Sequence, residues 1–127
     1  MAKTALVTGG GAGIGEGIAL RLVKAGMAVG VMDINAAAAE KVAADIKAAG
    51  GKAVALVADV SKRDQVDAAV AKLRQALGPV TVLVNNAGLI QFIPFADISV
   101  EQWDRTFEVN VRGPFNCTQA VAKAYTA

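Results

Sequence analysis

The sequence of 127 residues contains no histidine, one cysteine, one tyrosine and two serines. Without histidine, the chain has neither a Ser-His or Cys-His nucleophile pair nor a histidine-ligated metal site. The single cysteine, Cys117, allows neither an internal disulfide nor a thiolate metal cage, which suits a reducing compartment. We therefore expect a protein without a metal site, whose chemistry depends on other side chains.

Charge and hydrophobic runs exclude further classes of partner. The formal net charge is only +2 and the charges are scattered, which favours neither nucleic acid nor an anionic membrane. The longest apolar stretches, near residues 25–32 and 80–84, are much shorter than the roughly 20 residues that span a bilayer. The N-terminus also lacks the apolar core and cleavage site of a signal peptide. We expect a cytoplasmic protein.

Apolar residues, by contrast, make up 54% of the chain, which is enough for a domain with its own core. Four short runs carry Val or Leu on both faces, as strands do when helices cover both sides of a parallel sheet. These runs are residues 4–7, 28–32, 53–57 and 81–84.

Amphipathic stretches with helix signals separate the runs. The first carries an apolar stripe that ends at Gly26, formed by Ile14, Ile18, Leu22 and Val23. Asn35 is the expected N-cap of a helix over 36–49, and Ser61 the expected cap of one over 63–77. Ser99 and Gln102 fit a capping box that opens a further helix, and a last helical pattern starts near residue 114.

The resulting order is β-α-β-α-β-α-β-α-α, which predicts a Rossmann-type, doubly wound parallel sheet of the α/β class. Residues 1–127 are interpreted as one domain portion, without an internal linker. The last helical pattern runs to Ala127 without a Gly, Asn or Pro stop and without a following strand. We expect the fold to be truncated after the fourth strand and its following helices.

Glycines crowd the turn between the first expected strand and helix, which reads Thr-Gly-Gly-Gly-Ala-Gly-Ile-Gly over residues 8–15. Glycine permits positive φ and lets backbone N–H groups approach a pyrophosphate at a helix N-terminus, where the dipole favours anions. A Walker A lysine is excluded because Glu16 occupies its position, and G-x-G-x-x-G does not fit. The alternative is a flexible turn that packs a helix on the sheet. The spacing that fits is T-G-x-x-x-G-x-G, on Thr8, Gly9, Gly13 and Gly15.

Two carboxylates follow expected strands. Asp33 lies 20 residues after Gly13, where a carboxylate can accept hydrogen bonds from adenosine ribose hydroxyls. This favours NAD over NADP, because a carboxylate repels a 2′-phosphate and neither residues 10–12 nor Ile34 supply a cation; the alternative is a charge at a helix N-terminus. Asp59 precedes Val60, and the residues leave open whether it contacts the adenine edge or is a turn acid.

Two further motifs follow in the chain, Asn85-Asn86-Ala87-Gly88 after the fourth strand and Val109-Asn110-Val111 in the fifth helix region. Together with the glycine turn and Asp59-Val60, they make the whole chain resemble the N-terminal half of the short-chain dehydrogenase/reductase family. The Ala-Leu-Val-Thr-Gly start and the Asp33 carboxylate are similar to acetoin- or polyol-type and 3-oxoacyl-type reductases.

The resemblance implies cofactor-binding roles for the matching residues. Thr8 and the turn glycines would hold the cofactor diphosphate, with a backbone contact from Ile14, and Asp59 and Val60 join the cofactor-binding set. The cofactor cleft at the end of the fourth strand would be lined by Asn86, Ala87 and Gly88.

Asn110 matches the catalytic asparagine of the family, which positions a water in a proton relay. Its alternative role, a helix-kink residue that bonds the backbone, is compatible with the first. In the family, a Ser orients the substrate, a Tyr is the general acid/base and a Lys lowers the pKa of that Tyr. Here both serines precede Asn110 and look like caps, and Tyr125 follows it too closely. We expect the catalytic portion to lie outside this chain and the chain to be inactive alone.

The segment 89–98 is apolar, and two interpretations stay open: a wall of a substrate pocket, or a loop anchored on the body by Phe92, Ile93 and Phe95. Trp103 and Phe107 share a helix face and are expected to pack. In the family this region often forms a subunit interface, which is compatible with a homo-oligomer of the full-length enzyme. Cys117 is expected in the core.

The sequence therefore favours an NAD-dependent oxidoreductase that interconverts an alcohol and a ketone, with a small-molecule substrate, represented by its cofactor-binding half. NADP is the less favoured cofactor. The alternatives are a module that binds a dinucleotide without turnover and a truncated inactive fragment.

Overall fold

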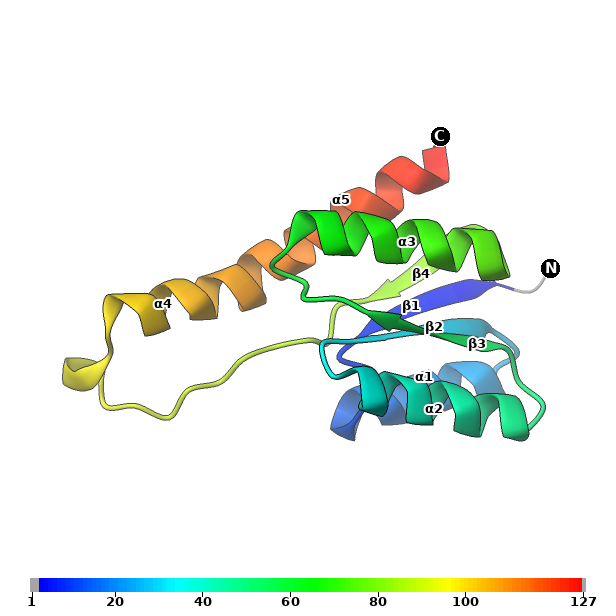
Figure 1. The fold of residues 1–127 in the computed structure, drawn as a ribbon, viewed down its shortest axis with the longest axis horizontal. Coiled ribbons are helices and arrows are strands. Elements are labelled where there is room, and N and C mark those ends of the chain that lie inside the picture. The colour runs from blue at the N-terminus through cyan, green and yellow to red at the C-terminus, as the bar shows by residue number, and fades with distance from the viewer. Residues whose placement is uncertain (1–2, 127) are drawn as a thin grey trace.

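The computed structural model describes residues 3–126, which form a four-stranded parallel β-sheet in the order β3-β2-β1-β4 (Figure 1). The strands are β1 (Thr4–Thr8), β2 (Ala28–Asp33), β3 (Ala53–Val57) and β4 (Val80–Val84). Each lies within one residue of its expected bounds, because short apolar runs with turn signals define strands well. The predicted α/β class and parallel sheet are confirmed.

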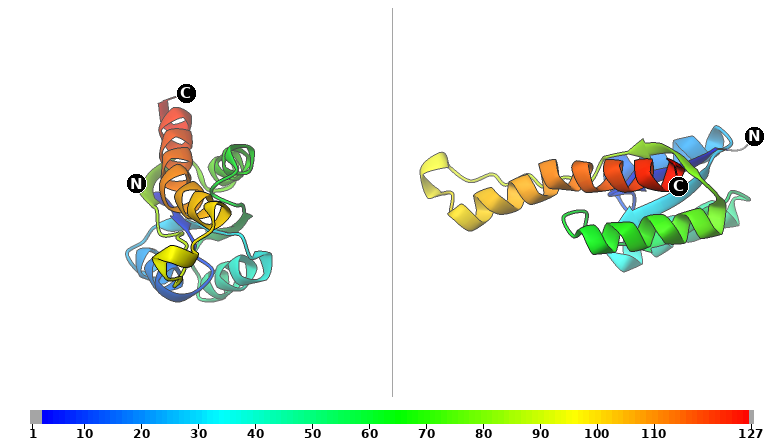
Figure 2. Two further views of the ribbon diagram at one scale, coloured as in Figure 1. Left: turned by 90° about the vertical axis from the view of Figure 1, so that its left-hand side faces the viewer. Right: turned by 90° about the horizontal axis from the view of Figure 1, so that it is seen from above.

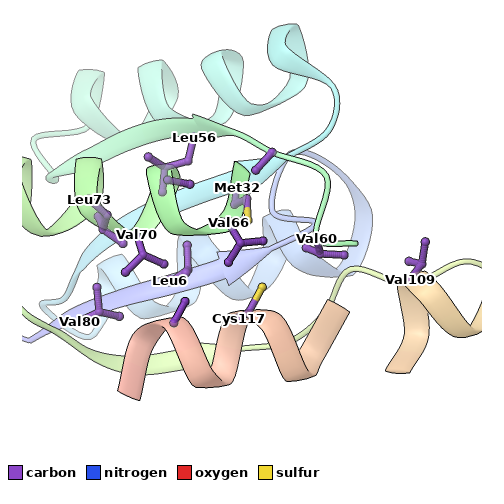
Figure 3. Packing of buried hydrophobic residues seen from close by; sticks show 13 residues of the cluster. Leu6, Met32, Leu56, Val60, Val66, Val70, Leu73, Val80, Val109 and Cys117 are labelled. Atoms are coloured by element: carbon purple, nitrogen blue, oxygen red, sulfur yellow. The ribbon is translucent and has the colours of Figure 1, made fainter. Parts of the chain in front are cut away.

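Helices cover both faces of the sheet. On one face lie α1 (Gly13–Lys24) and α2 (Ala36–Ala48), and on the other α3 (Arg63–Leu77) and α5 (Gly113–Thr126), as Figure 1 shows. Successive strand residues point to opposite faces, so Leu6 belongs to the core under α3 and α5 and Val7 to the core over α1 and α2. Figure 3 shows the first core, in which Cys117 of α5 lies near the strand side chains, as expected.

A segment of different character links β4 to α5. Residues 89–107, here named the arm, contain the 3-10 turn η1 (Phe95–Asp97) and helix α4 (Val100–Phe107). The π-helical turn η2 (Glu108–Arg112) then joins α4 to α5. Figures 1 and 2 show the arm projecting beyond the end of the sheet. Every residue of α4 is exposed or half-buried.

The helix caps agree with the sequence at two positions and differ at one. The Asn35 side chain accepts a hydrogen bond from Ala38 N, and Ser99 forms the predicted capping box with Gln102. The prediction that Ser61 caps α3 was wrong. The N-cap is Lys62, and the Ser61 hydroxyl instead donates to Asp59 Oδ1 at 2.7 Å, because that carboxylate lies only two residues away.

Three expectations about apolar packing also change. The stripe on α1 packs through Ile18, Leu22 and Val23, whereas Ile14, in the first turn, is 78% exposed. Phe92 and Phe95 do not anchor their loop on the body, since they are 94% and 85% exposed. Trp103 and Phe107 pack on each other, with ring centroids 4.9 Å apart, while both remain about half exposed.

Within the described residues, none of the helices has the length and apolar character needed to cross a membrane.

Candidate functional site

A cavity of about 360 Å³ opens at the carboxyl ends of the strands. It is lined by residues at or just after the ends of all four strands, among them Gly9, Asp33, Asp59 and Asn86, and by Arg105 of α4. In the sheet, β2 and β3 lie on one side of β1, and β4 lies on its other side. Such a switch point is where open α/β sheets bind their ligands.

The glycine turn is packed tightly on the sheet side. Gly9 and Gly13 have φ of +64° and +57°, a backbone conformation that residues other than glycine rarely adopt. A Cβ on Gly15 would collide with the carbonyl oxygen of Gly9 and lie 2.5 Å from Asn86 Nδ2. A Cβ on Gly13, in contrast, would have nothing within 4 Å. The turn is therefore closed toward the sheet and open on its other side.

The N-terminus of α1 lies in this turn. Its N-cap is Ala12, so in the described residues no side chain caps the first N–H groups of the helix. These groups, with the positive end of the helix dipole, form an arrangement that accepts an anion. Thr8, Gly9, Gly13, Ile14 and Gly15 thus meet at one end of the sheet, as the sequence predicted.

Thr8 and Asn86 connect the turn after β1 to the turn after β4. Thr8 Oγ1 accepts hydrogen bonds from the backbone N–H groups of Asn86 and Ala87, both at 3.0 Å. Asn86 Nδ2 donates to the carbonyl oxygen of Gly9 at 3.2 Å. The two turns that flank the cavity are therefore held in a fixed relation.

Asp33, at the end of β2, is held at the edge of the same cavity. One carboxylate oxygen accepts from Gly11 N and the other from Asn35 N, each at 3.0 Å. A Cβ on Gly11 would lie 2.8 Å from Asp33 Oδ2, so only glycine lets the turn approach this closely. The carboxylate lies between the glycine turn and the start of α2.

Asp59, two residues after β3, has a largely buried side chain that is 14% exposed. Its Oδ1 accepts from the backbone N–H and the hydroxyl of Ser61, and its Oδ2 from Arg105 Nη2 at 3.1 Å. Burial alone would raise the pKa of this carboxyl, but the hydrogen bonds from Ser61 and then Arg105 outweigh it and lower the pKa. Asp59 is therefore an ionised acceptor at neutral pH.

Sequence reasoning missed Arg105 and Asn116 in this region. Arg105 is 46 residues from Asp59 along the chain, and local motifs carry no signal for such a pair. The Asn116 side chain, which is 4% exposed, donates to the Val60 carbonyl oxygen at 2.9 Å. A buried polar residue on an otherwise apolar helix face is the one signal that could have pointed to Asn116.

Asn110 lies in the π-helical turn and pairs with the loop after β4. Its Oδ1 accepts from Leu89 N at 2.7 Å, and its Nδ2 donates to Leu89 O at 2.8 Å. The side chain therefore bonds the backbone, as one of its two expected roles requires. Gly88 lies beside it, since a Cβ there would be 3.4 Å from Asn110 Oδ1. π-Helical turns are frequent at functional sites.

Cys117 is fully buried, and burial raises its pKa to about 11. A thiol with this pKa is protonated at neutral pH and is a poor nucleophile. Its place in the core agrees with the expectation from the sequence.

The parallel sheet, the glycine turn at its switch point and the open helix N-terminus define a Rossmann-type α/β protein. A model of the short chain dehydrogenase family matches residues 3–127, and the chain belongs to this family. The resemblance seen in the sequence is therefore confirmed.

Individual relatives agree with this assignment. The chain is 42% identical to a sorbitol dehydrogenase of Cereibacter sphaeroides over 125 residues, which cover 98% of this chain and 48% of that protein. A solved dehydrogenase/reductase of Sinorhizobium meliloti matches with a TM-score of 0.92 and 39% identity, over 98% of this chain and 50% of that one.

A blue fluorescent protein from a metagenomic library, solved in complex with NADPH, matches with a TM-score of 0.89 and 37% identity. That match covers 96% of this chain and 51% of the other. The chain spans about half the length of the curated relatives it matches, and the matches lie in their N-terminal half.

Proposed function

We propose that residues 1–127 are the NAD-binding portion of an oxidoreductase that interconverts an alcohol and a ketone. Membership in the short chain dehydrogenase family supports the reaction class. The observation that carries the choice of cofactor is the Asp33 carboxylate, held at 3.0 Å from Gly11 N at the rim of the glycine turn. Bound NAD would supply the hydride acceptor at its nicotinamide ring.

The glycine turn and α1 fit a dinucleotide diphosphate. The open side of Gly13 leaves room for phosphate oxygens, and the uncapped N–H groups at the start of α1 can donate to them. Thr8 joins this turn to the turn after β4, because its hydroxyl oxygen accepts hydrogen bonds from Asn86 N and Ala87 N. Together with Gly88, these two residues line the cleft where the cofactor would continue from the diphosphate.

Asp33 selects between NAD and NADP by charge. A fixed carboxylate can accept hydrogen bonds from the two ribose hydroxyls of NAD, and it repels the 2′-phosphate of NADP. The neighbouring positions 10–12 and 34 are Gly, Gly, Ala and Ile, so they carry no cation that would compensate a phosphate. NADP is therefore the weaker ligand in this proposal.

Asn110 contributes to the reaction by position. Its two bonds to Leu89 fix the loop that follows the cofactor cleft, and as a catalytic residue it would hold a water for proton transfer.

The substrate is a small alcohol or ketone. The exposed apolar side chains of Phe107, Val111 and Phe115, on α4, η2 and α5, support a homo-oligomer through this face. The composition favours a cytoplasmic location.

The substitution Asp33→Ala tests the cofactor assignment. It should weaken NADH binding on the order of tenfold, because hydrogen bonds to a charged group are lost. NADPH binding should stay the same or improve, because the repulsion is removed. Dissociation constants for both are measured by fluorescence titration.

The matched control is Asp45→Ala, which removes an exposed carboxylate of α2 that pairs with Lys41 at 3.1 Å. This variant should bind both cofactors like the unsubstituted chain. An equal loss of NADH and NADPH affinity in Asp33→Ala would contradict the selective role of Asp33.

A further inference from the structure

Helix α4 lies outside the core, and polar side chains attach it to the rest of the molecule. Every residue of α4 is exposed or half-buried, and Figure 2 shows the helix extending past the sheet. Gln91 Nε2, within the arm itself, donates to Gln102 O and Thr106 Oγ1. Arg105 reaches further, to the residues that follow β3. Arg105 therefore joins the arm to the cavity wall.

The guanidinium of Arg105 makes a forked contact. Nη1 donates to Ser61 Oγ at 2.8 Å and Nη2 donates to Asp59 Oδ2 at 3.1 Å, while Glu108 Oε2 lies 3.6 Å from Nη1. Ser61 in turn donates to the other oxygen of Asp59. Both oxygens of the carboxylate are thus held, and rotation of the carboxylate about the Cβ–Cγ bond of Asp59 would break the hydrogen bonds of both oxygens.

The pattern of bonds leaves Asp59 with acceptor capacity. An ionised carboxylate has about four acceptor positions, and the Ser61 N–H, the Ser61 hydroxyl and Arg105 occupy three of them. Asp59 lines the cavity, as Arg105 does. A group that meets the remaining position must donate a hydrogen bond, because an ionised carboxylate has no proton to give.

We propose that Arg105 is a positioning residue that orients the Asp59 carboxylate so that it selects a base with an exocyclic amine. The inference rests on the proposed function and adds that the base of the dinucleotide lies against Asp59. Adenine offers an N6 amine as donor. Hypoxanthine has a carbonyl oxygen at the same position, which would leave two acceptors facing each other.

Other contacts keep the loop folded when Arg105 is replaced. Gln65 Oε1 accepts from Asp59 N at 2.9 Å, and Asn116 holds the Val60 carbonyl oxygen. These bonds come from α3 and α5, not from the arm. The loss of the guanidinium therefore releases the carboxylate without releasing the backbone that carries it.

The test compares NADH with reduced nicotinamide hypoxanthine dinucleotide, in which a carbonyl oxygen replaces the exocyclic amine and N1 of the base carries a hydrogen. The unsubstituted chain should bind NADH about tenfold or more tightly than the analogue. In Arg105→Met the ratio of the two dissociation constants should fall to within about twofold. Arg105→Lys should give an intermediate ratio, because a lysine cannot bond Asp59 and Ser61 in one fork.

Arg74→Met is the matched control. It removes an arginine from the exposed face of α3 with the same change of charge and should leave the ratio unchanged. Far-UV circular dichroism and a thermal melt establish that each variant is folded. Ser61→Ala, a smaller change, provides a second test and should lower the ratio in the same direction.

Three results would overturn the inference in distinguishable ways. If Arg105→Met weakens both ligands equally, Arg105 is structural and does not position Asp59. If the unsubstituted chain binds NADH and the analogue equally, Asp59 does not read the base, while the proposed function stands. If the unsubstituted chain is folded but binds neither ligand, the proposed function fails together with the inference.

Discussion

Apolar residues are frequent both in the arm and in the sheet with its covering helices. The sheet buries these residues, whereas the arm leaves large ones exposed. In the sheet, Leu6, Val29 and Val31 are fully buried. In the arm, Phe92 is 94% exposed and Phe95 is 85% exposed. The difference lies in the neighbours, because the strands have helices on both faces and the arm projects beyond them (Figure 1). Apolar composition indicates burial only where the fold supplies a second layer.

The strongest way to test this difference is to shorten one large side chain in each region. Leu73 of α3 is fully buried under the sheet, and Leu73→Ala should lower the free energy of unfolding by about 2–5 kcal/mol, because it leaves a cavity. Trp103→Ala in the arm should cost less than about 1 kcal/mol, since it removes chiefly the contact with Phe107. Urea denaturation followed by circular dichroism measures both; equal losses would show that the arm is packed as tightly as the sheet.

A smaller effect is expected from adding one methyl group within α1. Gly15→Ala places a Cβ against the Gly9 carbonyl oxygen and Asn86, and should cost about 1–3 kcal/mol and weaken NADH binding. Gly17→Ala, two residues further on, meets nothing within 4 Å and should stabilise the helix by about 0.5–1 kcal/mol. Urea denaturation should give stability changes of opposite sign for the two variants if the close packing is confined to the turn. NADH titration measures the loss of binding in Gly15→Ala. Stabilisation by both substitutions would contradict it.

The smallest effect concerns the link between the two regions. The pKa of Asp59 is lowered in the folded state, so its charge adds stability above the unfolded pKa of roughly 4, and this contribution is lost as the pH falls through the lower folded value. Asp59→Asn should therefore cost at most about 1 kcal/mol at pH 7. The cost should shrink below about pH 4, as measured by urea denaturation across pH.

The control for this titration is Asp104→Asn, which changes an exposed carboxylate of α4 and should alter stability by less than about 0.5 kcal/mol. A cost of Asp59→Asn that stays constant from pH 7 to pH 3 would show that the charge of Asp59 does not contribute.

Local pattern was sufficient to predict most of the sheet and the position of the glycine turn. The strands have both faces covered, so their apolar runs are unbroken, and parallel strands bring their carboxyl ends to one edge. Thr8, Asp33 and Asn86 therefore meet there as expected. The caps at Asn35 and Ser99 were also predictable, because each bonds a backbone N–H three residues away.

The contacts that could not be predicted join distant parts of the chain or compete with a local rule. Asn110 bonds Leu89, which is 21 residues away, and Arg105 bonds Asp59 across 46 residues. Ser61 has the residue type and the position of a cap, but the nearby carboxylate takes its hydroxyl. The exposure of the arm was missed because the sequence shows that its residues are apolar but not whether another layer of the fold covers them.

Ala12 distinguishes α1 from the helices that Asn35 and Ser99 cap with their own side chains. A capping side chain contributes about 1 kcal/mol to a helix, and α1 is formed without this contribution. If phosphate oxygens take the place of the cap, as the proposed function requires, part of the affinity for the ligand is the stability that α1 lacks alone. Folding and binding are then thermodynamically linked at Ala12, and a ligand at 100 times its Kd would stabilise the chain by about 2.7 kcal/mol.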